Sequence, residues 1–581
     1  MCGISGIIVK NNTFKINIDS LIDNLINFQE RRGPDASGKY ITNTLGLGHN
    51  RLSIQDIDKR SNQPFLYKNL VMVFNGEIYN YIELKKNLIN EDDLITESDT
   101  EVLIKLFHKN GINKTLDLLN GMFSIALYDK NINKLYLIRD RLGIKQCYFY
   151  EDTNKFIFSS TPASIAKTLN KLEKKKLSIN TNSLFHYLSG GICLTTSTMF
   201  NGINGLEPGS YFEFDITNFS KKKIKWWKFK NNKQNNNIEE IIKKSVHIRN
   251  RSNTNGYVLF SGGIDSSIIV NNSDKFNILS LDVGEYKYAE KIAEELKKKE
   301  RLFKIDKEFV INETKYFIEE QRKIINFTGI PVRASFLMTI CGKYIYNLNK
   351  KSDNRHKIVL SGIGGNELFY GHRRMKLTEH GMEDHIKNIY HYLSQIETID
   401  NKYKDSFIKF KETLIDEILN NNILPDNINK KNIHRWLEIK TFLLNDLLIN
   451  SDAIFMYYSL ESRVPFLDHN IVEYIMSCPP EECFYNSEEI ISGVSWRNYT
   501  KNNKKQLKEI LKKQLSDESL HHPKFTYELQ RHLIGPLYYN LCDKFIERSI
   551  IKWNGPWTKF NATLVGNLEL WFQEFEYLLI I

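Results

Sequence analysis

The sequence contains no run of 18 apolar residues, so it lacks the stretch that a transmembrane helix requires. Its first residues, MCGISGIIVKNN, have no basic segment followed by an apolar one, so they do not resemble a signal peptide. We therefore expect a cytoplasmic protein with no membrane association.

Paired cysteines are missing as well. The chain has 7 cysteines, which is an odd number, and no two of them form a CxxC motif. Disulfide frameworks and zinc sites depend on paired or regularly spaced cysteines, so neither is expected.

Acidic residues are outnumbered, at 69 Asp and Glu against 80 Lys and Arg, which gives a net charge of +11. A basic chain can bind nucleic acid. The lysines, however, are spread along a sequence that is also rich in Asn and Ile, which indicates solvated lysines rather than a binding patch. We expect no nucleic-acid partner, and small anionic substrates suit the charge equally well. A chain of 581 residues is long enough for several domains.

The stretch YVLFSGGIDSS, residues 257–267, combines a short apolar strand, a glycine-rich turn and the start of a helix. Adjacent glycines let backbone N–H groups surround an anion, and a helix N-terminus adds further donors. Asp265 would repel a bare phosphate, so its presence favours a Mg²⁺ ion between the carboxylate and the phosphate. The alternative is an ordinary strand-to-helix turn. The Asp-Ser-Ser that follows the glycines favours a nucleotide site.

Cys2 follows the initiator methionine and precedes Gly3. Removal of Met1 would leave a thiol beside a free α-amine, whose reference pKa of about 7.7–8.0 allows it to act as a base. Such a cysteine carries its own nucleophile and base. The alternative is a second-position cysteine with no role.

Polar motifs further along the N-terminal third support the interpretation of Cys2 as a nucleophile. Arg51, at a strand start, suits a carboxylate. Asn75 and Gly76 follow an apolar run and can direct an amide and an N–H at one oxyanion. Asp99 supplies a carboxylate for an ammonium group.

The motifs MCGI, RRGPD, RLSI, FNGEIYNY, SDTEV and LIRDRLGIK, in this order, resemble the class II glutamine amidotransferase domain. The resemblance implies an α+β N-terminal-nucleophile glutaminase fold with layered αββα architecture. Cys2 would attack the glutamine side-chain amide, and Asn75 and Gly76 would form the oxyanion hole. Arg51 would hold the α-carboxylate of glutamine. The implied glutamine-binding set is Arg51, Leu52, Ser53, Ile54, Gln55, Asn75, Gly76, Glu77 and Asp99.

In the remaining two thirds, short strands alternate with helical segments, which predicts a doubly wound parallel sheet. A second loop, SGIGGNE at 361–367, follows a strand and is expected to face the 261–267 loop, because ligands bind beyond the carboxyl ends of such strands. LESRVPFLDH at 460–469 and HPKF at 522–525 also stand out.

With the 261–267 loop, these motifs resemble the synthetase domain of glutamine-dependent asparagine synthetase. The resemblance implies activation of aspartate by MgATP to β-aspartyl-AMP, which ammonia from the first domain then converts to asparagine, with AMP and pyrophosphate released. Lys524 would be catalytic, and Arg333 would face aspartate. The implied ATP-binding set is Leu259, Ser261, Gly262, Gly263, Asp265, Ser266, Val283, Ser361 and Gly362. Asp265 would hold Mg²⁺, and the side-chain oxygen of Asn366, which stands where the family has a carboxylate, can also coordinate it.

The 361–367 loop departs from the pattern of that family, because Ile363 and Asn366 replace carboxylates. Two alternatives therefore stay open. One is a related ligase that adenylates another carboxylate, and the other is a homologue that only hydrolyses glutamine or is not catalytic.

We expect a glutaminase domain at 2–195, a hairpin and Asn-rich linker at 196–237, a synthetase domain at 238–535 and a C-terminal extension at 536–581. The resemblance also implies a homodimer.

Overall fold

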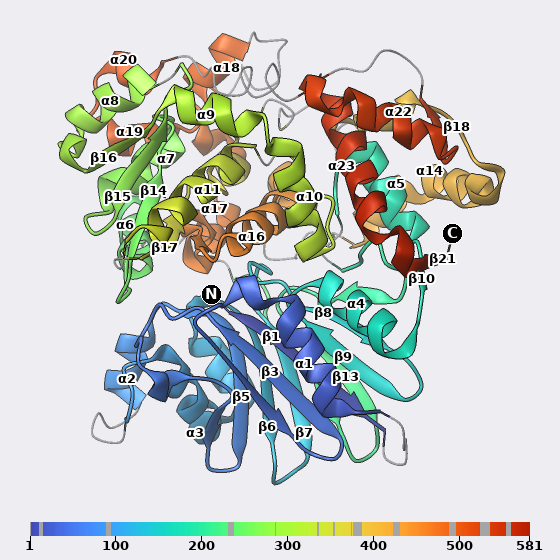
Figure 1. The fold of residues 1–581 in the computed structure, drawn as a ribbon. Coiled ribbons are helices and arrows are strands. Elements are labelled where there is room, and N and C mark those ends of the chain that lie inside the picture. The colour runs from blue at the N-terminus through green and yellow to red at the C-terminus, as the bar shows by residue number, and fades with distance from the viewer. Residues whose placement is uncertain are drawn as a thin grey trace.

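The computed structural model describes two halves that lie one above the other (Figure 1). The lower half holds the N-terminal sheets, the upper half holds most of the helices, and the N-terminus lies at the boundary between them. The described residues are 2–10, 16–88, 94–193, 196–230, 237–284, 286–333, 336–352, 355–372, 375, 386–421, 430–486, 496–522, 535–553 and 559–580.

The lower half contains two antiparallel sheets of six strands each. The first has the order β11-β8-β9-β1-β3-β2, with β1 (Gly3–Val9), β2 (Ala36–Ile41), β3 (Leu45–Arg51), β8 (Tyr148–Glu151), β9 (Lys155–Ser159) and β11 (Ile203–Gly205). The second has the order β13-β12-β7-β6-β5-β4, with β4 (Phe65–Tyr67), β5 (Leu70–Ile78), β6 (Gly121–Asp129), β7 (Lys134–Arg139), β12 (Ser210–Asp215) and β13 (Ser220–Lys225).

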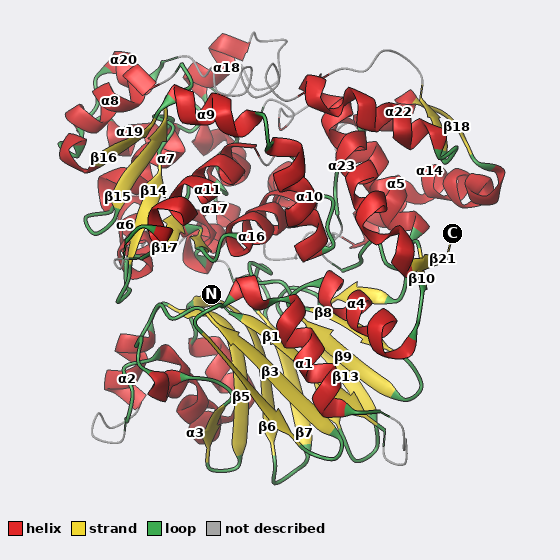
Figure 2. Cartoon of the chain, in the orientation of Figure 1, coloured by secondary structure: helices red, strands yellow, loops and turns green. Residues whose placement is uncertain are grey.

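The two sheets pack face to face, and helices cover their outer faces (Figure 2). Ile4 and Leu47 of the first sheet and Val73 and Leu137 of the second belong to one buried cluster between the sheets. Helices α1 (Ile18–Phe28) and α4 (Pro162–Glu173) contact the first sheet, and α3 (Asp99–Leu118) contacts the second, next to α2 (Tyr81–Leu88). This layering confirms the predicted αββα fold.

The hairpin expected as part of a linker lies inside this half. Strand β12 pairs with β7, and β11 pairs with β8, so residues 203–225 complete both sheets. The second strand of this hairpin, β13, covers Ser220–Lys225. The hairpin was predicted from the sequence, but the membership of its strands in a sheet depends on partners far away in the sequence.

The upper half is built on a five-stranded parallel sheet with the order β16-β15-β14-β17-β19. The strands are β14 (Asn255–Leu259), β15 (Asn277–Leu281), β16 (Leu302–Ile305), β17 (His356–Leu360) and β19 (Glu461–Arg463). The chain starts at central β14, adds β15 and β16 on one side, and then crosses to add β17 and β19 on the other. Ligands of doubly wound sheets bind at such a switch point, beyond the ends of the two central strands.

Both faces of this sheet are buried. Successive side chains of a strand point to opposite faces, so neighbouring residues report on the two faces separately. Tyr257 and Val359 belong to one buried cluster, whereas Val258 and Ile358 belong to another. Helices α7 (Ile264–Asn272), α8 (Tyr286–Glu295) and α16 (Leu448–Tyr457) contact the strands of this sheet. The same half also contains α6 (Ile238–Arg249), α9 (Lys307–Thr314), α10 (Phe317–Thr328), α11 (Phe336–Lys350), α12 (Gly365–Leu368), α15 (Ile433–Leu437), α17 (His469–Ser477), α18 (Trp496–Asn502), α19 (Lys505–Leu511) and α20 (Asp517–Leu520). The predicted doubly wound α/β domain is therefore confirmed.

The C-terminal residues, together with two earlier segments of the chain, form a helical layer on the side of the upper half (Figure 1). The indole of Trp571 is fully buried and donates to the Gly329 carbonyl at 2.9 Å. The final strand, β21 (Leu579–Ile580), pairs in parallel with β10 (Leu177–Ser178). This layer comprises α5 (Thr181–Gly190), α14 (Asn401–Asn421), α22 (Tyr539–Glu547), α23 (Lys559–Phe575) and the antiparallel pair β18 (Ile396–Ile399) and β20 (Ile551–Trp553).

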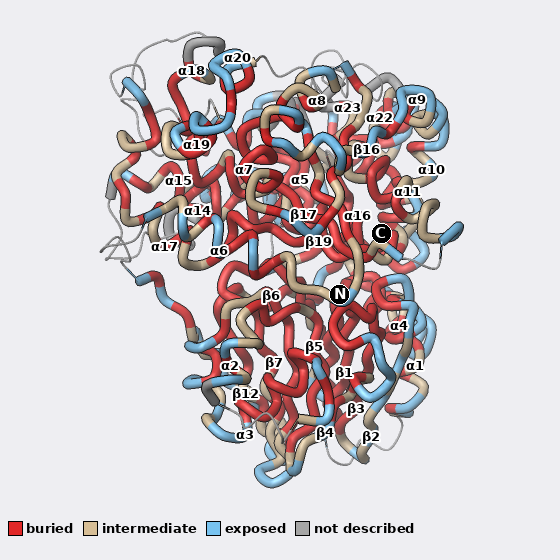
Figure 3. Tube along the Cα trace, turned by 90° about the vertical axis from the view of Figure 1, so that its left-hand side faces the viewer, coloured by how far each residue is buried: buried red, intermediate tan, exposed pale blue. Residues whose placement is uncertain are grey.

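No helix in the described ranges has the length and apolar character needed to cross a membrane. Buried segments continue on both sides of the boundary between the halves (Figure 3), which is where the first candidate site lies.

Candidate functional site

A polar cavity lies where the two halves meet. Both halves contribute to its wall, although the wall comes mainly from the N-terminal half. The lining residues are Cys2, Arg51, Leu52, Ile54, Gln55, Ser61, Gln63, Phe74, Gly76, Glu77, Ser98, Asp99, Thr100 and Glu461.

Cys2 is held at the start of β1 by contacts to its backbone. Its N–H donates to Asn75 Oδ1 at 3.0 Å, and its carbonyl accepts from Arg32 Nε at 3.1 Å. Burial raises the pKa of the Cys2 thiol. A thiol in this environment needs a nearby base to become a nucleophile.

The side-chain amide of Asn75 uses its oxygen in a hydrogen bond but not its nitrogen. Its oxygen accepts from Cys2, but its buried Nδ2 has no hydrogen-bond partner among the described residues. The next residue, Gly76, lines the cavity, and a Cβ there would lie 2.0 Å from the Met122 carbonyl oxygen. Only glycine fits this position. A buried donor without an acceptor beside Cys2 is the arrangement that an oxyanion would complete.

Arg51 was expected at the start of a strand, but it is the last residue of β3, and its guanidinium holds the loop that follows. It donates to the carbonyl of Asp58 and to Asn62 Oδ1, both at 2.7 Å, and also to the Asp56 carbonyl. Arg51 also lines the cavity. Its predicted contact with a substrate carboxylate stays a prediction.

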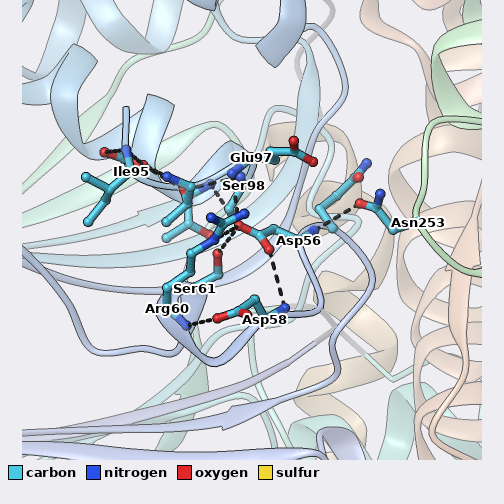
Figure 4. A network of polar contacts seen from close by, with 12 residues as sticks. Asp56, Asp58, Arg60, Ser61, Ile95, Glu97, Ser98 and Asn253 are labelled. Atoms are coloured by element: carbon cyan, nitrogen blue, oxygen red, sulfur yellow. Dashed lines mark hydrogen bonds and ion pairs between the residues drawn. The ribbon is translucent and has the colours of Figure 1, made fainter. Parts of the chain in front are cut away.

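Asp56 organises the same loop, as Figure 4 shows. Its Oδ2 accepts from Arg60 Nε at 3.0 Å, Ser61 Oγ at 2.9 Å and the Glu97 N–H at 2.9 Å. Its own N–H donates to Asn253 Oδ1 at 3.0 Å, in the segment that leads into β14. The loop is therefore anchored to both halves of the molecule.

A cluster of buried carboxylates, Glu77, Asp99 and Glu461, also lines the cavity. Glu77 accepts from Gln55 Nε2 at 2.9 Å and from Arg463 NH2 at 3.1 Å. Arg463 Nε also donates to Glu461 at 2.6 Å. Burial raises the pKa values of Glu77 and Asp99, whereas the pKa of Glu461 is lowered, because nearby positive charges, Arg463 among them, outweigh its burial.

The RLSI segment divides between the cavity and the boundary. Leu52 and Ile54 line the cavity. Ser53 instead donates its N–H to Asp35 Oδ2 at 2.7 Å, and its carbonyl accepts from Lys357 Nζ at 3.0 Å. Lys357 also reaches Asp35 at 2.6 Å, so this segment fixes the boundary between the two halves.

The second candidate site is the loop between β14 and α7. Gly262 has φ +74, a conformation that favours glycine, and Gly263 begins the helix without a side-chain cap. Ser261 and Ser266 lie 3.3 Å apart through their hydroxyl oxygens. The half-buried Leu259 precedes this loop, and the buried Val283 follows the neighbouring strand. The backbone here matches an anion-binding turn.

The 361–367 loop packs directly against this turn, as predicted from its place after β17. A Cβ on Gly362 would lie 3.0 Å from Asp265 Cβ, and one on Gly365 would lie 2.6 Å from Asp265 Cγ. The buried Ser361 Oγ has no hydrogen-bond partner among the described residues. The structure therefore brings the predicted ATP-binding segments together.

Two further predictions have different outcomes. Arg333 is buried and donates to Asp446 Oδ2 at 2.6 Å and to the Gly190 carbonyl at 3.2 Å, so its predicted contact with aspartate stays a prediction. Lys524 lies outside the described residues.

Two residues of these sites were not singled out from the sequence. Glu461 reaches the first cavity from the other half of the chain, within the LESRVPF motif. Lys504 places its ammonium between Asp265 and Asn366, at 2.5 and 2.6 Å from the carboxylate oxygens and 2.6 Å from the amide oxygen. No local pattern distinguishes Lys504 from the neighbouring lysines of its helix.

Two family models together match most of the chain. Residues 1–227 match the glutamine amidotransferase domain, and residues 237–547 match asparagine synthase. The geometry and these matches define a two-domain amidotransferase. Because the second match alone spans more than half of the sequence, the chain belongs to the asparagine synthase family.

Two of the similar proteins with curated names are called asparagine synthetases, and a third is called an amidase. A protein of Methanocaldococcus jannaschii named putative asparagine synthetase [glutamine-hydrolyzing] 2 is 31% identical over 412 residues, covering 64% of this chain and 76% of that protein. Asparagine synthetase [glutamine-hydrolyzing] 1 of Bacillus subtilis is 26% identical over 527 residues, covering 83% and 82%. Amidase chry2 of Gibberella zeae is 25% identical over 647 residues, covering 94% and 91%.

Proposed function

We propose that the protein is a glutamine-hydrolysing asparagine synthetase. The cavity around Cys2 is the observation that carries the proposal, because it gathers residues predicted for glutamine binding from several separate segments of the sequence. The packing of the 361–367 loop against Asp265 supports the second half of the reaction.

In the first step, removal of Met1 frees the α-amine of Cys2, which accepts the thiol proton. The thiolate attacks the side-chain carbonyl carbon of glutamine, and the resulting oxyanion is stabilised by Asn75 Nδ2 and the Gly76 N–H. The C–N bond then breaks, and the proton on the α-amine goes to the departing ammonia. Water hydrolyses the thioester to give glutamate. Arg51 would hold the α-carboxylate, and Glu77 and Asp99 would hold the α-ammonium.

In the second step, the β-carboxylate of aspartate attacks the α-phosphorus of ATP, which forms β-aspartyl-AMP and releases pyrophosphate. The backbone donors of 261–263 would hold the pyrophosphate, with Ser266 and Ser361 as hydroxyl donors. Ammonia attacks the acyl carbon, which yields asparagine and AMP. Magnesium enters as the counter-ion of ATP. Lys524 is proposed to stabilise the charge that develops on the acyl and phosphate oxygens.

One assay tests the proposal. The purified protein is incubated with glutamine, aspartate, ATP and Mg²⁺, and glutamate, asparagine and pyrophosphate are measured. We expect all three products. Glutamate without pyrophosphate would exclude a ligase. If pyrophosphate forms only with an acid other than aspartate, the protein is a ligase with a different acceptor. This is the second candidate function, and it is favoured by the apolar Ile363 in the loop that faces Asp265.

Replacement of the nucleophile separates the two steps. Cys2→Ala should abolish glutamine-dependent synthesis and leave ammonia-dependent synthesis intact. Cys542→Ala, a buried thiol of the C-terminal layer, is the matched control and should retain both activities. Equal loss with both nitrogen donors in Cys2→Ala would contradict two separate sites.

A further inference from the structure

The ammonium of Lys504 is held at the nucleotide loop by residues from two other segments. Nζ donates to both carboxylate oxygens of Asp265, at 2.6 and 2.5 Å, and to Asn366 Oδ1 at 2.6 Å. The Lys504 side chain is 4% exposed. Asp265 lies in the first turn of α7, Asn366 in α12, and Lys504 directly before α19. A charge-assisted contact of this kind is strong because water is excluded from it.

The backbone of Lys504 shows that its position is constrained. Its φ of 56° and ψ of 34° lie in the left-handed region, which residues other than glycine adopt infrequently. The flanking backbone is fixed, since Asn503 Nδ2 donates to the Tyr370 carbonyl at 3.1 Å and the Lys508 N–H donates to the Lys504 carbonyl at 3.0 Å. Residues held in sparsely populated conformations concentrate at functional sites.

Glycines on the facing segments make room for this contact. A Cβ on Gly371 would lie 2.2 Å from Asn366 Oδ1 and 2.6 Å from Lys504 Cε. A Cβ on Gly365 would lie 2.6 Å from Asp265 Oδ1. The Lys504 side chain and both of its acceptors therefore lie close to the backbone of a glycine, where any side chain would clash.

The charges at this point balance without a metal ion. Asp265 contributes one negative charge, Lys504 one positive charge, and Asn366 none. Magnesium binds through anionic oxygens with near-octahedral geometry, and an ammonium that shares those oxygens repels it. The residues therefore do not fit the predicted magnesium site at Asp265 and Asn366.

We propose that Lys504 is the resident cation of the nucleotide loop. Its ammonium takes the position between Asp265 and Asn366, so the protein has no magnesium site there before the nucleotide binds. Metal reaches the loop only on the phosphates of ATP. The inference rests on the proposed function only in taking this loop as the nucleotide site.

Manganese binding tests the proposal, because Mn²⁺ replaces Mg²⁺ and its free concentration can be measured by electron paramagnetic resonance. The full-length protein is titrated with Mn²⁺ alone, without nucleotide, glutamine or aspartate. Wild type and Asp265→Asn should bind Mn²⁺ equally. Lys504→Met should gain one site at least about tenfold tighter than any in wild type, and Lys504→Met with Asp265→Asn should lose it again. Lys505→Met is the matched control and should behave as wild type.

Two outcomes would overturn the proposal. One is a Mn²⁺ site in wild type that Asp265→Asn abolishes. The other is a folded Lys504→Met protein, shown by its circular dichroism, that gains no site. If Lys504→Met does not fold, the comparison of wild type with Asp265→Asn still decides the question. Binding of MnATP to wild type is a separate measurement, and its absence would count against the proposed function rather than against the neutral Asp265–Lys504 pair.

Discussion

Glu77 allows a sharp test of how the cavity binds its substrate. Its buried negative charge lowers the free energy of unfolding, whereas the same carboxylate is proposed to bind glutamine. The side chain is 3% exposed, and burial, with the charge of Asp99 as the next cause, raises its pKa well above the ordinary value. Arg463 compensates only in part, since its guanidinium lies 3.1 Å from Glu77 but 2.6 Å from Glu461. We therefore expect Glu77→Gln to relieve the fold and weaken glutamine binding.

The stability effect has a definite sign. An acid whose pKa is raised in the folded state favours folding below its unfolded pKa of about 4.3, and this contribution is lost as the pH rises toward the folded value. Glu77→Gln removes the titration, so its melting temperature should rise relative to wild type as the pH increases from about 4.3. Arg463 keeps its contacts with Glu461 and with the Arg249 and Arg251 carbonyls at 2.7 Å, so no buried charge is left unpaired. Each unit of pKa shift corresponds to about 1.4 kcal/mol.

The functional effect has the opposite direction. A hydrogen bond to a charged group contributes about 1.5–3 kcal/mol, and the proposed contact of Glu77 with the α-ammonium of glutamine is of this kind. Gln keeps an oxygen acceptor but lacks the negative charge, and a charge-assisted hydrogen bond is roughly twice as strong as a neutral one, so about half of this contribution should be lost. The KM for glutamine should therefore rise by roughly 3–10-fold, because about 1.4 kcal/mol corresponds to a factor of ten. The kcat of glutamine hydrolysis should change little, since Glu77 is not proposed to contact the amide.

Glutaminase kinetics and thermal melting over a pH series measure both effects. Glu83→Gln is the matched control, because Glu83 forms an ion pair with Arg251 at 2.6 Å at a more exposed position that does not line the cavity. Its KM should stay within about twofold of wild type. An unchanged KM in Glu77→Gln, or a melting temperature that falls relative to wild type as the pH rises, would refute the reasoning.

Three further variants test other parts of the first site. Gly76→Ala should abolish glutamine hydrolysis while ammonia-dependent synthesis persists, because its Cβ would lie 2.0 Å from the Met122 carbonyl; a variant with normal glutaminase kinetics would contradict this. Arg32→Met should lower the unfolding free energy by about 3–5 kcal/mol in denaturant melts, since it leaves buried Asp452, now 2.8 Å from the guanidinium, without that partner; a loss under about 1 kcal/mol would oppose it. The pKa of Asp56 is lowered, because hydrogen bonds from Glu97, Ser61 and Arg60 outweigh its burial. Asp56→Ala should therefore cost about 1–3 kcal/mol at neutral pH, and its difference from wild type in thermal melts should shrink below about pH 4, whereas a pH-independent difference would argue against a charge effect.

The first site was largely readable from the sequence because its chemistry lies in short motifs. Cys2 directly precedes β1, and Asp99 is the first residue of α3, so local patterns predicted both these residues and their setting. For Arg51 and Asn75–Gly76 the residues were singled out but their setting differs, because Arg51 ends β3 and Asn75–Gly76 lie within β5. The contacts of Asp56 were not predicted, since they depend on Glu97 and Asn253, which approach only after folding.

The second site was predicted less completely, for a physical reason. Alternating strands and helices predicted a parallel sheet, and because both loops follow strands, the 261–267 and 361–367 loops were expected at the same edge of it. Their direct packing results from β14 and β17 being neighbours, an order that alternation alone does not give. The position of Lys504 depends instead on a left-handed backbone at the start of α19 and on glycines that allow close approach. Neither feature has a local sequence pattern in a lysine-rich segment.

The short strand β19 explains why the LESRVPF motif stood out without a visible role. The Arg463 side chain bonds to Glu77 in the wall of the Cys2 cavity, whereas its carbonyl accepts the Ser361 N–H at 3.1 Å, at the start of the loop that faces Asp265. Backbone and side chain of one residue thus contact both candidate sites. An apolar residue could supply the carbonyl but not the guanidinium, and arginine on an exposed strand could supply neither site with a fixed position. The motif is therefore understood only when the two domains are considered together.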